Sequence, residues 1–358
     1  MLRRIGSMLA VIVIGASCAG TTSPGSNASP VSSASSAPSS GSSSSAGVAA
    51  SPTIQVSLPT ASPHPLASVT HSMDDLKANR LKAEIQVGSY PDWQVTLDGS
   101  LWVSTGDGVV ARIDQSADKV VQRVPVNGPC LGMAGGFGSL WAPACGANEL
   151  DRVDPKTNKV VARIALPAIP GDGEGQVVAA FGSVWLFTDD KGTLARIDPK
   201  TNKIAATFST GLDGIAIVAA EGSLWATVPD KDAVARIGTD GKVLQTIPVG
   251  RRPRFIAAGE GGVWSLGQGE GDVTRIDPKT GHVVATIPVY VPGDGGCIAA
   301  GGGSVWVTMP ETPVSRIDPA TNQVTERFTG AGGDCISVSA GSVWLSNLQI
   351  GTVWRINP

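Results

Sequence analysis

The sequence has few histidines and no excess of positive charge. It contains three His, and its 27 Lys and Arg are outnumbered by 30 Asp and Glu, which gives a formal net charge of −3. Without a basic surface to neutralise phosphates, the composition argues against nucleic acid as a partner. His64 and His71 precede the repeats described below, and His282 lies in a predicted outer turn. No Ser-His or Cys-His catalytic pair is therefore predicted.

A hydrophobic run long enough to span a membrane is also missing. Two arginines precede an apolar run over 8–16, which leads to small residues and Cys18. This order is typical of a secretory signal, and Ile14–Cys18 resembles a bacterial lipobox, whose Cys carries lipid after cleavage. An ordinary signal peptide cut at the nearby small residues is the alternative. We predict a signal peptide over 1–18, lipidation of Cys18, and a cell membrane-attached lipoprotein on the extracytoplasmic side.

Charged and large apolar residues are scarce from 19 to 70, where Ser, Ala, Gly, Pro and Thr dominate. Such a segment cannot bury enough apolar surface to offset chain entropy, so we predict a disordered stalk over 19–70. Ser72 is followed three residues later by Asp75, a pattern typical of a helix N-cap. This predicts a short helix within 71–80.

What the sequence contains in abundance is repetition. Gly-Ser-Leu/Val-Trp, or a close variant, recurs about every 40 residues, and an Arg follows each Trp by ten or eleven residues. Most of these Arg precede Ile-Asp-Pro-x-Thr-Asn/Gly, which is typical of a tight hairpin turn. The seven tryptophans are Trp102, Trp141, Trp185, Trp225, Trp264, Trp306 and Trp344. Seven repeats of four short antiparallel strands predict an all-β, seven-bladed β-propeller over 81–358.

The two ends of the repeat region complement each other. The last repeat stops at residue 358 without the outer strand that follows this motif elsewhere, and a matching strand occurs at 83–88, before the first Trp. We therefore predict that the N-terminal strand pairs into the last blade and closes the ring, which removes two exposed strand edges.

Four cysteines lie within the repeats. Cys130 and Cys145 are equidistant from a predicted turn at 137–138, and Cys297 and Cys335 each lie nine residues before a Trp in neighbouring repeats. Directly opposed strand positions suit disulfide geometry. Of the three possible pairings we predict Cys130–Cys145 and Cys297–Cys335, which fit an oxidising compartment.

Functional residues are sought where one repeat differs from the others, because residues present in every repeat are expected to serve the fold. The variable loops gather on one rim. Asp92, Arg254 and Asp334 each lie ten residues before a Trp, and the first and last blades adjoin, which predicts an acidic arc with Arg254 across the channel. The candidate ligand-binding residues are Asp92, Trp93, Arg254, Tyr290, Asp294 and Asp334. Solvated rim charges are the alternative to a site for a polar ligand, an amine or a metal.

No cofactor is predicted, with a divalent cation as the alternative. Carboxylates in two Gly-rich loops are suitable ligands for a hard cation, although their spacing is not diagnostic. They are Asp172, Glu174, Glu270 and Asp272.

The repeated units Gly-Ser-Val-Trp-Val, Val-x-Arg-Ile-Asp-Pro-x-Thr-Asn-x-Val and Ala-Thr-Ile-Pro-Val-Gly resemble the YVTN and virginiamycin B lyase-like group of seven-bladed propellers. The resemblance covers about residues 81–358. It implies the fold and, for the lyases of that group, opening of a cyclic depsipeptide by elimination with magnesium and an active-site His. No His of this sequence lies where that role could be filled, so no catalytic residue is carried over.

The sequence thus predicts an exported, lipid-anchored, monomeric propeller. Its loop-bearing rim is expected to act as a non-catalytic binding or scaffold module for a protein, a glycan or a small molecule. The alternative function is a metal-assisted lyase or lactonase that uses rim carboxylates.

Overall fold

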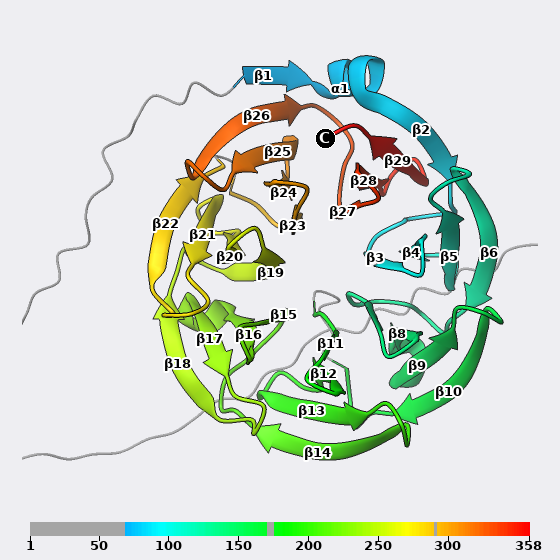
Figure 1. Ribbon diagram of the computed structural model, residues 1–358, viewed down its shortest axis with the longest axis vertical. Helices are drawn as coiled ribbons and strands as arrows, with labels where there is room; N and C mark the ends of the chain where they lie inside the picture. The colour runs from blue at the N-terminus through cyan, green and yellow to red at the C-terminus, as the bar shows by residue number, and fades with distance from the viewer. Residues whose placement is uncertain (1–68, 170–174, 290–291) are drawn as a thin grey trace, which may run out of the picture. The chain divides into compact units, whose positions relative to one another are not determined.

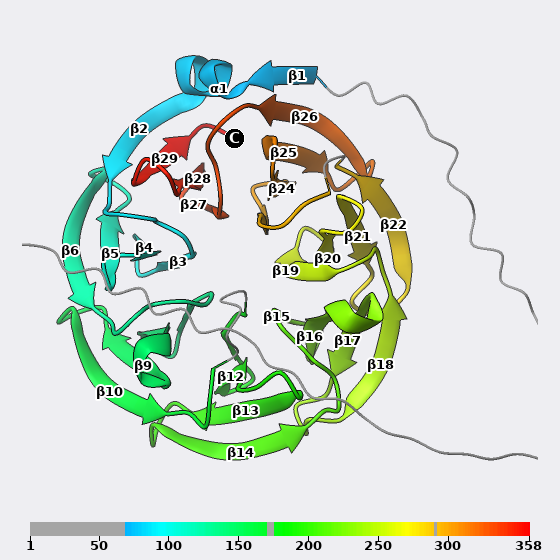
Figure 2. The same ribbon diagram turned by 180° about the vertical axis from the view of Figure 1, so that it is seen from behind.

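Seven β-sheets surround a central axis (Figure 1), and Figure 2 shows the same ring from behind. The computed structural model describes residues 69–169, 175–289 and 292–358. Within these residues six sheets have four strands and one has five, which confirms the predicted seven-bladed propeller. The predicted signal peptide, Cys18, the stalk up to residue 68 and Tyr290 lie outside the described residues.

Each blade runs from an inner strand near the axis to an outer strand on the circumference (Figure 1). Blade 1 contains β3 (Gln94–Leu97), β4 (Ser100–Thr105), β5 (Val109–Asp114) and β6 (Lys119–Pro125). Blade 2 contains β7 (Ala134–Gly136), β8 (Ser139–Ala144), β9 (Glu149–Asp154) and β10 (Lys159–Ala165). Blade 3 contains β11 (Val178–Ala180), β12 (Ser183–Phe187), β13 (Thr193–Asp198) and β14 (Lys203–Ser209). Blade 4 contains β15 (Ile217–Ala220), β16 (Ser223–Val228), β17 (Ala233–Ile237) and β18 (Val243–Pro248).

The remaining blades include strands from both ends of the chain. Blade 5 contains β19 (Pro253–Gly259), β20 (Gly262–Gly267), β21 (Asp272–Ile276) and β22 (Val283–Pro288). Blade 6 contains β23 (Cys297–Gly301), β24 (Ser304–Met309), β25 (Thr312–Asp318) and β26 (Gln323–Thr329), with β1 (Val69–Ser72) at its edge. Blade 7 contains β27 (Ile336–Ser339), β28 (Ser342–Asn347) and β29 (Thr352–Ile356), completed by β2 (Leu81–Gln86).

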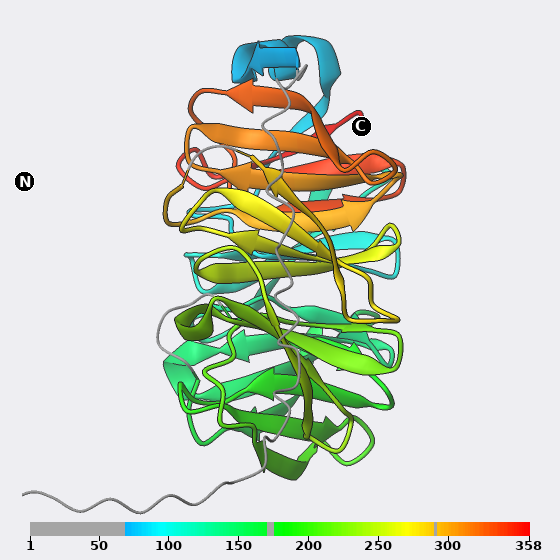
Figure 3. The ribbon, with the colours of Figure 1, turned by 90° about the vertical axis from the view of Figure 1, so that its left-hand side faces the viewer.

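The N-terminal strand closes the ring as predicted. β2 pairs antiparallel with β29, and Ile85 faces Val353 across this pair. The Ile85 side chain is buried, and so is that of Val87 just beyond the strand. β1 was not predicted as a strand, and it pairs parallel with β26 on the outside of blade 6 (Figure 3).

A short helix, α1 (Met73–Arg80), joins β1 to β2. The Ser72 hydroxyl accepts a hydrogen bond from the Asp75 amide at 3.0 Å, and the Asp75 carboxylate accepts one from the Ser72 amide at 3.0 Å. This capping box satisfies two backbone donors at the helix start, so the predicted helix and its N-cap are confirmed.

The seven repeated tryptophans are packing residues. Each is at most 1% exposed, and several indole nitrogens donate to the carbonyl oxygen five residues earlier, as Trp141 does to Gly136 at 3.1 Å. Their burial between sheets accounts for one Trp per blade at a fixed position.

In most blades the repeated arginine connects its own blade to the next. The Arg152 guanidinium lies 5.0 Å from the Trp141 ring centroid, and its Nε donates to the Ser139 hydroxyl at 2.8 Å in its own blade. Its Nη1 donates to the Pro199 carbonyl oxygen at 2.7 Å and to the Asn202 side chain at 2.8 Å in blade 3. A single side chain therefore ties the first hairpin of one blade to the last turn of its neighbour.

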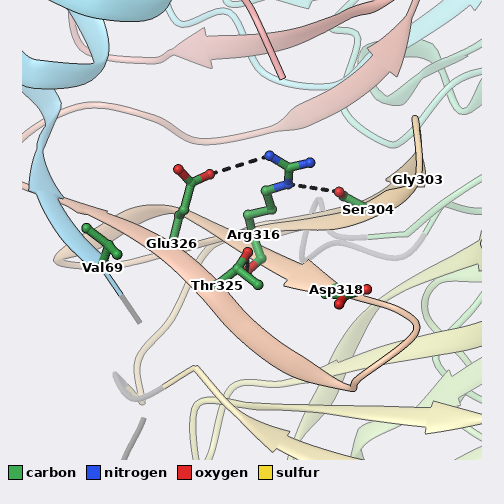
Figure 4. Close-up of a pocket in the computed structure, with 7 residues that line it drawn as sticks. All are labelled: Val69, Gly303, Ser304, Arg316, Asp318, Thr325 and Glu326. Atoms are coloured by element: carbon green, nitrogen blue, oxygen red, sulfur yellow. Dashed lines mark hydrogen bonds and ion pairs between the residues drawn. The ribbon is translucent and has the colours of Figure 1, made fainter. Parts of the chain in front are cut away.

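Arg112 and Arg355 make the same set of contacts, and Arg355 reaches from blade 7 to Gln115 and Asp118 in blade 1. Arg275 also bonds to the last turn of the next blade, but in its own blade it donates to the Gly261 carbonyl oxygen instead of a serine. Arg316 differs because blade 7 has β2 in place of an outer hairpin. Its Nε donates to Ser304 at 2.9 Å and its Nη1 forms an ion pair with Glu326 at 3.6 Å (Figure 4).

We expect Arg152→Ala to lower the free energy of unfolding by about 2 to 3 kcal/mol, since it removes charge-assisted hydrogen bonds between blades. The matched control is Arg196→Ala. Arg196 lies over Trp185 and Phe208, and among the described residues it makes no hydrogen bond to blade 4, whose last turn is the shorter Gly238–Gly241. Its loss should cost about 1 kcal/mol. Urea denaturation of both variants measures the difference, and equal losses would contradict the proposed inter-blade role.

Candidate ligand-binding site at the channel mouth

A hollow of about 250 Å³ lies on the loop-bearing rim, where the connections into the inner strands of four blades meet. It brings together three of the residues predicted from sequence, Asp92, Trp93 and Asp334. The other lining residues were not predicted and are Phe255, Gly295, Gly296, Cys335 and Leu348.

Two aspartates from adjoining blades meet in this hollow. The Asp92 side chain hydrogen-bonds to the Asp334 side chain, and both residues are half-buried. Two carboxyl groups can bond to each other only when one of them carries a proton. Burial raises the pKa of Asp334 above its ordinary value, although the hydrogen bond from Asp92 acts in the opposite direction. The pair therefore keeps a shared proton at pH values where an exposed Asp is ionised.

The backbone on both sides of this pair is fixed by Ser346. The Ser346 carbonyl oxygen accepts from the Asp334 amide at 2.8 Å, and the Ser346 hydroxyl donates to the Asp92 carbonyl oxygen at 2.8 Å. The Asp92 amide in turn donates to the Ser104 carbonyl oxygen at 3.0 Å. These bonds hold the two aspartates in register across the junction of blades 7 and 1.

Gln94 reinforces the same junction and was missed by the sequence analysis. Its amide nitrogen donates to the Cys335 carbonyl oxygen at 2.8 Å and to the Ser346 hydroxyl at 3.0 Å. Its amide oxygen accepts from the Ser337 hydroxyl at 3.0 Å. The sequence does mark Gln94 as unusual, because the residue eight positions before the repeated Trp is apolar in the six other blades.

The apolar side of the hollow is made by Trp93 and Phe255. Their ring centroids lie 5.8 Å apart, although the residues come from blades 1 and 5. Both are buried, and a Cβ built on Gly132 in the connection into blade 2 would lie 3.0 Å from the Trp93 ring. Trp93 is therefore a buried residue in the wall of the hollow. It is not an exposed surface on which a ligand could stack.

Glycine keeps the blade 6 side of the hollow open. A Cβ built on Gly296 would lie 2.4 Å from the Thr308 carbonyl oxygen, so a side chain cannot be accommodated without a shift of the backbone. Gly296 also has a φ of 107°, which favours glycine.

Both predicted disulfides are present. Cys335, in the wall of the hollow, is bonded to Cys297 at the start of β23, and this link joins blades 6 and 7. Cys130 is bonded to Cys145, and beside this link Pro129 pairs with Ala144 in an antiparallel bridge.

The other predicted rim residues lie away from the lining of the hollow. Arg254 is half-buried beside Phe255, and its carbonyl oxygen accepts from the Thr227 hydroxyl at 3.2 Å. Asp294 has a side chain that is 85% exposed and forms an ion pair with Arg252 at 2.5 Å. Tyr290 is not among the described residues.

Of the four carboxylates considered for a cation, Asp172 and Glu174 lie outside the described residues, and Glu270 and Asp272 have different surroundings. Glu270 pairs with Arg251 at 3.1 Å, whereas Asp272 is buried against Gly250 and Gly267. Burial, followed by the charge of Glu270, raises the pKa of Asp272 to about 6. Among the described residues no group of three His, Cys, Asp or Glu is arranged to hold a metal ion.

The described histidines are remote from the hollow. His71 stacks on Phe328 at the edge of blade 6, with ring centroids 5.5 Å apart. His282 follows the turn between β21 and β22, and its carbonyl oxygen accepts from the Asp277 amide at 2.9 Å. Neither lines the hollow.

We expect Asp334→Asn to change the pH dependence of stability. The folded pKa of Asp334 is raised, so its contribution to stability is present below the ordinary pKa of Asp, about 4, and is lost as pH rises through the folded value. Asparagine imitates the protonated carboxyl and can still donate to Asp92. The variant should therefore gain stability over the wild type as pH rises from 4 to 7, measured by urea unfolding. The exposed Asp294→Asn is the control, and parallel curves for wild type and Asp334→Asn would refute the assignment.

The sequence matches no protein-family model and no curated protein sequence. Among solved structures, a streptogramin B lyase matches with a TM-score of 0.64 and 19% identity, over 77% of this chain and 96% of that one. A catalytically inactive virginiamycin B lyase from Staphylococcus aureus, solved with quinupristin, matches with a TM-score of 0.64 and 16% identity, over 77% of this chain and 98% of the other. At these identities the likeness concerns architecture, and the chain has the seven-bladed propeller fold found in the streptogramin B lyases.

Proposed function

We propose that this chain is an exported, lipid-anchored, monomeric β-propeller that acts as a binding module through its loop-bearing rim. The hollow at the channel mouth binds a positively charged group, such as a protonated amine, on a small molecule or at the surface of a partner protein. The hydrogen-bonded pair of Asp92 and Asp334 beside two aromatic rings is the observation that supports this function.

The chemistry of the pair favours a cation over a neutral ligand. Two carboxyl groups that share one proton can exchange that proton for an ammonium group, which has three donors to offer. Trp93 and Phe255 provide apolar contact at the wall of the hollow. The volume of about 250 Å³ lies just below the usual range for drug-sized ligands, so the hollow suits a single side group.

The site is organised before a ligand arrives. Ser346 and Gln94 fix the backbone on both sides of the aspartates, and the Cys297–Cys335 disulfide fixes the neighbouring wall. A site held in this way loses little conformational entropy on binding. A rigid hollow of this kind is better suited to recognition than to closure around a reacting substrate.

We expect benzylamine to bind the wild-type protein and its neutral counterpart benzyl alcohol to bind much more weakly, as measured by calorimetry. Affinity for the amine should rise with pH as the shared proton leaves the aspartate pair. Asp334→Asn should weaken amine binding by about tenfold, since a charged hydrogen-bond partner is lost. Asp294→Asn, which removes a rim carboxylate outside the hollow, should bind as the wild type does. Equal binding of the amine and the alcohol, or an unaffected Asp334→Asn, would refute the cation site.

A metal-assisted lyase or lactonase is the second candidate, because solved neighbours with this fold are lyases and paired carboxyl groups can act as acid and base. The described residues around the hollow do not provide a set of three metal ligands, so no step through a metal is derived. Magnesium-dependent turnover of a cyclic depsipeptide or lactone that is lost in Asp334→Asn would replace the binding function by this one.

Export is supported by the two disulfides, which are typical of oxidising, extracytoplasmic compartments. The described part of the chain contains no helix long and apolar enough to cross a bilayer. The proposed attachment to the membrane is through the lipid predicted on Cys18.

We expect Cys18→Ser to move the protein from the membrane fraction to the soluble fraction of cells, because the lipid-bearing thiol is absent. Cys297→Ser, which alters a cysteine within the ring, is the control and should stay with the membrane. A Cys18→Ser protein that sediments with membranes as strongly as the wild type would contradict the anchor.

A further inference from the structure

The rim opposite the hollow carries the first hairpin tip of each blade. Four residues before the repeated Trp, blades 1, 4 and 5 have an acidic residue and blades 6 and 7 have Gly or Ala. Blades 2 and 3 instead have Phe137 and Phe181, which are 42% and 43% exposed. Two neighbouring blades therefore present a large aromatic ring to solvent where the other five present none.

These two phenylalanines are in an unfavourable backbone conformation. Phe137 has a φ of 53° and Phe181 a φ of 52°, in the left-handed region that favours Gly, Asn or Asp. The fold needs a positive φ at each tip but not a bulky side chain. Because a phenylalanine at these positions lowers stability, we infer that the two rings serve a function other than folding.

The same two blades carry extra positive charge on this rim. The last turn of blade 2 has Lys156 and Lys159, and the last turn of blade 3 has Lys200 and Lys203, all exposed. The last turns of the other blades carry at most one lysine each.

Arg152 holds the aromatic and basic elements together. It bonds to Ser139, two residues after Phe137, and to Pro199 and Asn202, which flank Lys200. The two hairpin tips are also adjacent, because a Cβ built on Gly136 would lie 2.5 Å from that of Ala179. The turn with Lys156 and Lys159 lies on the same rim, where Arg112 bonds it to Ser100 in the first hairpin of blade 1. The two phenylalanines and the lysines of these two turns are called here the aromatic–lysine patch.

We propose that the aromatic–lysine patch binds an anionic lipid surface. Phenylalanine rings at loop tips enter the boundary between headgroups and acyl chains, and lysines around them attract the phosphates of anionic lipids. The excess of basic side chains at this place, in a chain of net negative charge, favours a membrane over a protein partner. With this rim on the membrane, the hollow on the opposite rim faces away from it. The inference goes beyond the proposed function and depends neither on a ligand in the hollow nor on lipid at Cys18.

The test uses the chain from residue 18 onward with Cys18→Ser, since all described strands lie beyond residue 68. It should cosediment with vesicles of phosphatidylcholine mixed with phosphatidylglycerol, less with phosphatidylcholine alone, and less again at high salt. Phe137→Asn with Phe181→Asn should weaken binding by about tenfold, because two partly inserted rings are lost. Its melting temperature should not fall, since Asn adopts a left-handed conformation more readily than Phe.

Charge variants provide the matched control. Lys156→Glu with Lys200→Glu should abolish the preference for anionic vesicles, whereas Lys279→Glu, at the equivalent turn position of blade 5, should retain it. Wild-type binding without preference for anionic lipid would overturn the proposal. So would unchanged binding of the double Phe variant, or a drop in its melting temperature, which would make the rings packing residues.

Discussion

The ring depends on a guanidinium group that is shared between two blades. Arg152 stacks on its own Trp141 and bonds to the last turn of the following blade, and the same arrangement recurs around most of the ring. The contact is effective because a half-buried Arg can offer several donors in one plane while its face lies on an indole. Arg355 repeats the contact from blade 7 to blade 1, so the ring is closed by hydrogen bonds between side chain and turn as well as by the strand β2.

Because the repeated residues serve this common purpose, departures from the repeat mark the positions with other roles. They concentrate where blades 7 and 1 meet, since Asp92, Gln94 and Asp334 all replace residues of other character there. The junction is also where distant parts of the chain must be held together. The hydrogen bonds of Gln94 and Ser346 therefore help to close the ring and also fix the position of the carboxyl pair.

The sequence allowed the fold, the closing strand, the helix and both disulfides to be predicted, because each depends on spacing along the chain and on local turn chemistry. Spacing also placed Asp92 next to Asp334, since equivalent positions in adjoining blades are neighbours. It did not give the direction of a side chain across the channel. Trp93 is accordingly buried against Phe255, a contact between blades 1 and 5, and Arg254 is not part of the lining. The strand β1 was missed because four residues that pair at one edge leave no periodic pattern.

The pKa values of the aspartates are shifted in opposite directions by their different surroundings. In the last turns, Asp154 and Asp318 accept hydrogen bonds from backbone amides, which hold the pKa of each below its ordinary value. Their contribution to stability is present above the ordinary Asp pKa and is lost as pH falls. At the loop-bearing rim, burial raises the pKa of Asp272 and Asp334, so their contribution is lost as pH rises. The last turns thus use ionised aspartates for structure, whereas burial favours the protonated form of Asp272 and Asp334.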